Sequence, residues 1–156
     1  MDYEVRNSTA ADLLWLATYM RQADKDEVAA ASGFTSSQTM LLGMYNSPFM
    51  KTGLVDGVPV IIFGAAPHAD DDRIGVPWML ATDMLTAPKC KRIMLRHSRK
   101  WIEEVQKLYP VLANITDKRN KAHHRWIQWC GFTFINEVYR GPCNAPFLQF
   151  VRIRNV

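Results

Sequence analysis

The stretch that decides the fold is Val111–Val138, with the sequence VLANITDKRNKAHHRWIQWCGFTFINEV. Its first residues favour a β-strand, and a polar turn with Thr116 or Asp117 as helix cap then predicts the start of an amphipathic helix. Gly131 predicts the end of that helix, because glycine adopts the left-handed backbone conformation that follows many helices. The residues after it favour a second strand. The stretch therefore predicts strand, helix and strand.

The rest of the chain favours an alternation of strands and helices. Ser8 or Thr9 predicts a helix cap, and Gly33 predicts a helix end, since both positions favour these residue types. We expect strands over Tyr3–Asn7, Phe49–Val55, Val58–Phe63, Val76–Leu85 and Phe147–Ile153, and helices over Ala10–Met20, Glu27–Ser32, Thr39–Tyr45 and Lys89–Tyr109.

The pair Asp56-Gly57 joins two of these strands and predicts a two-residue hairpin turn. Pro59 lacks a backbone N–H, so it predicts an edge or a bulge close to that turn. With Val76–Leu85 the hairpin becomes an antiparallel meander of three strands. The whole order predicts a mixed α/β or α+β sheet with helices on both faces.

Length and composition favour a single domain over residues 1–156, because 48% of the residues are hydrophobic and supply a sizeable core. Apolar runs such as Val58–Ala66 are too short to cross a bilayer, and the first residues lack a signal-peptide layout. We expect an intracellular protein with no membrane span. Three widely spaced cysteines, and histidines without ligand spacing, argue against a disulfide framework and a metal site.

Charge divides the chain into two unlike parts. Residues 1–88 hold five lysines and arginines against eleven acidic residues, whereas residues 89–156 hold fourteen against four. The second part therefore favours an anionic ligand or partner, such as a phosphorylated cofactor, a nucleic acid or an acidic protein surface. A solvated basic face is the alternative.

The order of elements, together with Asn120 eleven residues before Gly131-Phe132, resembles the GNAT superfamily of acyl-CoA-dependent acyltransferases over nearly the whole chain. The resemblance implies a mainly antiparallel central sheet of six to seven strands and acetyl-CoA as the cofactor. It also implies that Asn120, at the start of its helix, contacts the pantetheine.

A narrower resemblance is to small internal virion or virion-assembly proteins, with a GNAT-like fold, of short-tailed phages that encode their own RNA polymerase. Four separated segments carry it: Met20–Glu27, Gly57–Gly64, Pro77–Asp83, and scattered residues between Tyr109 and Phe132. This resemblance implies a phage or host protein as partner, and the host cytoplasm or the virion as location.

GNAT enzymes usually hold the diphosphate of CoA on a glycine-rich loop before the long helix, and the corresponding loop Leu85–Arg92 contains no glycine. Four cations at the start of this helix are candidates to hold the phosphates or another polyanion instead: Lys89, Lys91, Arg92 and Arg96. The alternative is that these cations are only solvated.

The catalytic groups that the resemblance implies are only partly present. The usual tyrosine acid would lie four residues before Gly131, where the chain has Ile127, and Tyr139 is the substitute candidate. Asp83, expected on the third strand of the meander, is the candidate base, with a structural hydrogen-bonding role as the alternative. For Asn120 a helix-start hydrogen bond is the alternative to cofactor contact.

Residues of the first helical region form a candidate rim of the acceptor site. They are Arg21, Asp24 and Glu27, and a surface ion network is the alternative.

Three hypotheses for function remain. The first is transfer of an acetyl group to an amine, such as a protein lysine or N-terminus; the second is a non-catalytic protein of virion assembly or host interaction; the third and weaker one is nucleic-acid binding.

Overall fold

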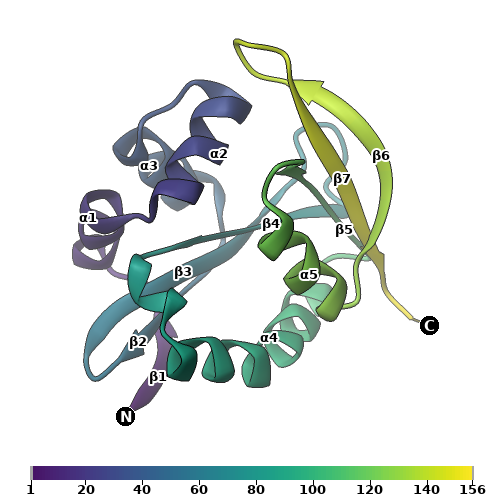
Figure 1. Cartoon of the computed structure of the whole chain (residues 1–156). Coiled ribbons are helices and arrows are strands. Elements are labelled where there is room, and N and C mark those ends of the chain that lie inside the picture. Colours follow the sequence, from purple (N-terminus) through teal and green to yellow (C-terminus); the bar gives the residue numbers. More distant parts are fainter. Residues whose placement is uncertain (1, 156) are drawn as a thin grey trace.

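The computed structural model describes residues 2–155, apart from the side chains of residues 40–42 and 44–45. Within this part of the chain, seven strands form one sheet in the order β1-β2-β3-β4-β5-β7-β6 (Figure 1). In chain order the elements are β1 (Tyr3–Asn7), α1 (Ala10–Tyr19), α2 (Gln22–Ser32), α3 (Ser36–Asn46), β2 (Phe49–Val55), β3 (Val58–Pro67), β4 (Ile74–Ala81), the 3-10 helix Asp83–Thr86, α4 (Pro88–Leu108), β5 (Val111–Asp117), α5 (Lys121–Trp129), β6 (Thr133–Arg140) and β7 (Ala145–Ile153). Neighbouring strands are antiparallel except β4 and β5, so the predicted mixed, mainly antiparallel sheet is confirmed.

The helices form two groups, α1 to α3 and α4 with α5, as Figure 1 shows. Under α1, Leu13 and Leu16 pack against Ile62 and Leu80 of the sheet. A second cluster joins α4, α5, β5 and β7, and its buried members are Ala65, Val105, Tyr109, Leu112, Ile127, Cys130, Phe132 and Phe150. Helices therefore cover both faces of the sheet, as predicted.

Local sequence signals account for most element boundaries. Thr9 caps α1 by accepting a hydrogen bond from the backbone N–H of Asp12, and Gly33 ends α2 in the left-handed conformation. Asp56 and Gly57 both have positive φ, as a two-residue hairpin turn requires. The register of β2 and β3 shifts opposite Pro59, so the predicted bulge is confirmed.

Strand β4 is shorter than predicted, because it ends at Ala81 and a 3-10 helix follows. Its last residue is held from outside the meander: the backbone N–H of Arg21 donates to the carbonyl oxygen of Ala81. Leu85 is buried, so its apolar side chain reflects core packing rather than a strand. The prediction that placed Asp83 on this strand is therefore wrong.

Three helix starts also differ from the prediction, and one of them is that of α3, which begins at Ser36 instead of Thr39. Helix α2 begins at Gln22, five residues before the predicted Glu27, and α5 begins at Lys121 with Asn120 as its cap. The predicted caps Thr116 and Asp117 belong to β5, where they pair with β7. Strand pairing thus extends through residues whose local propensity favours a cap.

Candidate functional site

Strands β4 and β5 separate in the middle of the sheet. They pair only at Ile74 with Val111 and at Gly75 with Leu112. Farther along, the side chain of Asn114 lies between them: its Nδ2 donates to the carbonyl oxygen of Pro77 at 2.6 Å, and its Oδ1 accepts from the backbone N–H of Ile115 at 2.7 Å. One amide side chain thus satisfies backbone groups that lack a partner strand.

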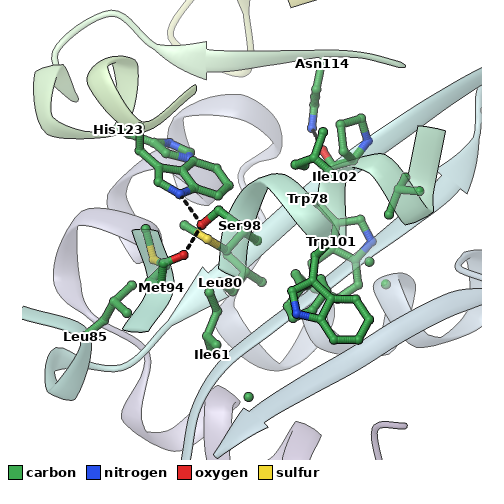
Figure 2. A pocket seen from close by; sticks show the side chains of 18 of the residues that line it. Ile61, Trp78, Leu80, Leu85, Met94, Ser98, Trp101, Ile102, Asn114 and His123 are labelled. Carbon is green, nitrogen blue, oxygen red and sulfur yellow. Dashed lines mark hydrogen bonds between the residues drawn. The ribbon is translucent and has the colours of Figure 1, made fainter. Parts of the chain in front are cut away.

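A cavity of about 410 Å³ lies at this opening and has walls from both faces of the sheet. Trp78 and Leu80 belong to the face that α1 covers, whereas Phe63 contacts Trp101 of α4 with ring centroids 5.6 Å apart. Figure 2 shows Trp78, Trp101, Ile102 and Leu80 around the space, with Asn114 at its edge. Aromatic and aliphatic side chains therefore make up most of the wall.

His123 of α5 is a polar side chain of the cavity wall that the sequence did not indicate as a site residue. Its ring stacks on Trp126 with centroids 5.5 Å apart, and Trp126 Nε1 donates to Ser98 Oγ at 2.9 Å. The hydroxyl of Ser98 in turn donates to the carbonyl oxygen of Met94 (Figure 2). This series of contacts fixes the position of both rings.

Burial lowers the pKa of His123 to about 4; the charge of Asp24 opposes this shift, and the positive charge of Arg21 adds to it. The imidazole is therefore neutral at neutral pH. Its Nδ1 lies 3.2 Å from Oγ1 of Thr116, the buried residue near the end of β5.

Glu27 of α2 also lines the cavity. Its Oε1 accepts hydrogen bonds from Thr116 Oγ1 at 2.8 Å and from the backbone N–H of Asp117 at 2.6 Å. Burial raises the pKa of Glu27, while these two hydrogen bonds oppose that shift. Glu27, Thr116 and His123 therefore form one hydrogen-bonded group at the wall of the cavity.

The other two predicted rim residues do not line the cavity. Asp24 is 1% exposed, and its Oδ2 accepts from Arg21 Nε at 2.9 Å and from the backbone N–H of Ala81 at 2.8 Å. The pair thus joins the start of α2 to the end of β4. Because Asp24 is buried, its position differs from both the predicted rim and the predicted surface network.

Asn120 makes the helix-start hydrogen bond that was one of its two predicted roles. Its Oδ1 accepts from the backbone N–H of His123 at 3.3 Å and caps α5. Its Nδ2 is buried and has no hydrogen-bond partner among the described residues. Asn120 does not line the cavity. A buried donor without a partner is costly, so a ligand oxygen that reached this amide would satisfy it.

The four predicted cations are brought together at the start of α4. Lys89, Lys91, Arg92 and Arg96 are exposed, and in residues 2–155 none of them forms an ion pair. Helix α4 has no side-chain cap, and it begins with Pro88. The positive end of the helix and these cations therefore coincide.

The predicted base and acid lie away from the cavity. Asp83 is exposed in the 3-10 helix, and Tyr139 is 52% exposed on β6, where its hydroxyl donates to Glu137 Oε2 at 3.2 Å. Ile127, at the position of the usual tyrosine, is buried in the core under α5. His123 lies one helical turn before Ile127. This spacing is the signal in the sequence that could have identified His123 as a site residue.

No helix in the described part of the chain is long and apolar enough to cross a membrane. No group of three or more histidine, cysteine or acidic side chains that could hold a metal ion is present in residues 2–155.

The fold is that of solved GNAT acetyltransferases. An acetyltransferase of the GNAT family from Streptococcus pneumoniae matches with a TM-score of 0.66 at 13% identity, over 99% of this chain and 100% of that one. Ribosomal-protein-alanine N-acetyltransferase from Brucella melitensis matches with a TM-score of 0.70 at 16% identity, over 97% and 99%. Aminoglycoside acetyltransferase AAC(6')-Ib in complex with coenzyme A matches with a TM-score of 0.67 at 14% identity, over 98% of this chain and 95% of that one. No family model and no curated protein matches the sequence. These likenesses confirm the predicted GNAT-like fold.

Proposed function

We propose that the chain is an acyltransferase that moves an acetyl group from acetyl-CoA to an amine. The observation that carries this proposal is the opening between β4 and β5, where a cavity passes between the two faces of the sheet beside the start of α5. Bound acetyl-CoA would supply an activated acyl group at this opening. The likeness to GNAT acetyltransferases, one of them in complex with coenzyme A, supports the choice of cofactor.

The residues present fit such a cofactor in two respects. Asn120 Nδ2 is a buried donor without a partner, and a carbonyl oxygen of pantetheine would satisfy it. The exposed cations Lys89, Lys91, Arg92 and Arg96 carry like charges at the positive end of α4, so phosphate groups would relieve a repulsion there.

Calorimetric titration with acetyl-CoA tests the proposal. We expect binding that weakens about tenfold or more in a Lys91→Gln/Arg92→Gln variant, because each phosphate contact is charge-assisted. Lys100→Gln controls for the loss of one exposed cation, since Lys100 lies farther along the same helix. Asn120→Ser keeps an oxygen cap for α5 and removes the amide donor, so it should also weaken binding. Absence of any heat at millimolar acetyl-CoA would refute the proposal.

A second candidate function is a non-catalytic GNAT-like protein of phage assembly or host interaction, located in the host cytoplasm or in the virion. The glycine-free loop before α4 and the buried Ile127 favour it, since both depart from the catalytic pattern of the superfamily. Its partner would be a phage or host protein. Purified virions and infected-cell pull-downs test it, and the absence of any stable protein partner would exclude it.

A further inference from the structure

The polar end of the cavity has a defined arrangement of protons. Glu27 Oε1 already accepts a hydrogen bond from the backbone N–H of Asp117, and the hydroxyl of Thr116 donates a second hydrogen bond to the same oxygen. The oxygen of Thr116 then accepts from Nδ1–H of His123, whose distance to Glu27 Oε2, 4.0 Å, is too long for a direct hydrogen bond. This assignment leaves Nε2 of the neutral imidazole as a free acceptor.

The same end of the cavity is unfavourable for a cation. Glu27 is the single carboxylate among the described side chains that line the cavity, and its Oε1 is already engaged by two donors. Arg21 places positive potential on His123, with the buried Asp24 as the opposing charge. An alkylammonium group entering here would lose its hydration and would meet the one carboxylate of Glu27, of which Oε2 alone is free, so pairing would repay only part of the desolvation cost.

The remaining wall favours a flat apolar body. Trp78 and Trp101 line the cavity from opposite faces of the sheet, and Phe63, Ile102 and Met94 add to the wall on the side of α4. Aromatic rings and thioether side chains of this kind bind planar apolar groups through their faces and edges.

From this geometry we propose that the acceptor is an aromatic amine that is uncharged at neutral pH, held between Trp78 and Trp101 with its amino group on Nε2 of His123. The inference rests on the proposed function and names its substrate class. The amine nitrogen attacks the thioester carbonyl carbon, a C–N bond forms, and the C–S bond breaks with its electron pair left on sulfur. The proton lost by nitrogen passes to His123 Nε2 and then to the thiolate, so that the products are an amide and a free thiol.

Two isomeric amines distinguish the effect of the ligand's charge on binding from the effect of its apolar surface area. 4-Propylaniline and 3-phenylpropylamine contain the same atoms, but the first is neutral at pH 7.5 and the second is an alkylammonium with a pKa close to that of lysine. Calorimetry without cofactor should show about tenfold tighter binding of 4-propylaniline, from the desolvation cost of the charged isomer. Equal or tighter binding of 3-phenylpropylamine overturns the inference.

Nitrogen-15 NMR of the histidines gives a second readout that does not depend on activity. We expect His123 as the Nδ1–H tautomer, with an Nε2 signal that shifts on addition of 4-propylaniline and not on addition of 3-phenylpropylamine. An Nε2–H tautomer in the free protein overturns the assignment. His68, in an exposed loop, is the internal control and should show no shift with either probe.

The outcomes also distinguish this inference from the function on which it rests. If acetyl-CoA binds and its acetyl group is transferred to 3-phenylpropylamine or a lysine peptide but not to 4-propylaniline, the acyltransferase stands and the substrate class is wrong. If 4-propylaniline binds but acetyl-CoA does not, the cavity assignment stands and the acyltransferase fails. If octanoyl-CoA displaces 4-propylaniline and binds more tightly than acetyl-CoA, the cavity holds an acyl chain and the inference fails.

Discussion

At the scale of single residues, the least expected side chain of the cavity wall is His123, which lies 3.2 Å from Thr116 Oγ1 and 4.0 Å from Glu27 Oε2. The sequence showed a histidine on an amphipathic helix, but its role depends on Thr116 and Glu27, which come from two other elements. The residue pattern of a single segment cannot predict contacts between side chains of three different elements. By contrast, the cap role of Asn120 and the helix-ending role of Gly131 follow from local backbone rules, and both are confirmed.

The buried imidazole should make stability depend on pH. The pKa of His123 falls from 6.5 to about 4 on folding, so its contribution is complete above pH 6.5 and is lost as pH falls through 4. Urea titration at pH 7 and at pH 4 measures the free energy of unfolding of both proteins. On going from pH 7 to pH 4, the free energy of unfolding should fall by about 3 kcal/mol less in His123→Gln than in the wild type. The nearby Arg21, Asp24, Glu27 and His124 remain in both proteins. Identical pH dependence in His123→Gln would contradict the buried neutral state.

Gly75 marks the last residue of β4 that pairs with β5, and its missing side chain makes room for Tyr109. A Cβ at this position would lie 2.3 Å from Cδ2 of the Tyr109 ring. Gly75→Ala should therefore lower the free energy of unfolding by about 1–3 kcal/mol in urea titrations. Tyr109→Leu should absorb part of this cost, so the double variant should lose less than the sum of the single changes. Strict additivity would mean that the ring is not what limits this position.

At the scale of elements, most strands and helices were predictable because each has a local pattern: the Asp56-Gly57 turn, the Thr9 cap and the long stripe of α4. The predicted boundaries are wrong where contacts between residues far apart in the sequence determine where an element begins or ends. The end of β4 depends on Arg21 and Asp24, and the start of α5 depends on the pairing of β5 with β7. The separation of β4 from β5 is a property of two elements together, and no single segment encodes it.

Asn114 should be a major support of that separation. Its replacement by alanine leaves the carbonyl of Pro77 and the N–H of Ile115 without partners, which costs about 2 kcal/mol or more of unfolding free energy. Asn136→Ala is the control, because Asn136 makes a single exposed side-chain hydrogen bond to Gln149. Comparable losses in the two variants, measured by urea unfolding, would show that Asn114 does not replace a missing strand.

At the scale of the whole molecule, two groups of strands share one sheet. Strands β1 to β4 form an antiparallel group and β5, β7 and β6 form another, and two residue pairs join them along the sheet. Other contacts add to this junction: Glu27 binds the end of β5, and Gly141 in the β6–β7 turn lies against Ala30 of α2. The cavity therefore lies between two groups of strands that helix α2 connects.

The contact of the β6–β7 turn with α2 can be tested with two glycines of similar backbone conformation. Gly141 has φ +79° and a Cβ there would lie 1.8 Å from the Ala30 carbonyl oxygen, whereas Gly57 has φ +77° and open space. Gly57→Ala should cost about 1–2 kcal/mol from backbone strain alone. Gly141→Ala should cost about 1–3 kcal/mol more and speed hydrogen exchange in α2. Equal costs with unchanged exchange would show that the turn does not support the helix.

The two-pair junction of β4 and β5 also has a kinetic consequence. The antiparallel hairpins on either side of it close over short loops, whereas this parallel pair can form only after the whole of α4 has crossed the sheet. Pairing over such a long loop carries a higher entropic barrier, so the junction belongs to the late part of folding. Substitutions at Ile74 or Leu112 should then speed unfolding much more than they slow refolding. The opening that admits a ligand would thus assemble after the hairpins on either side of it.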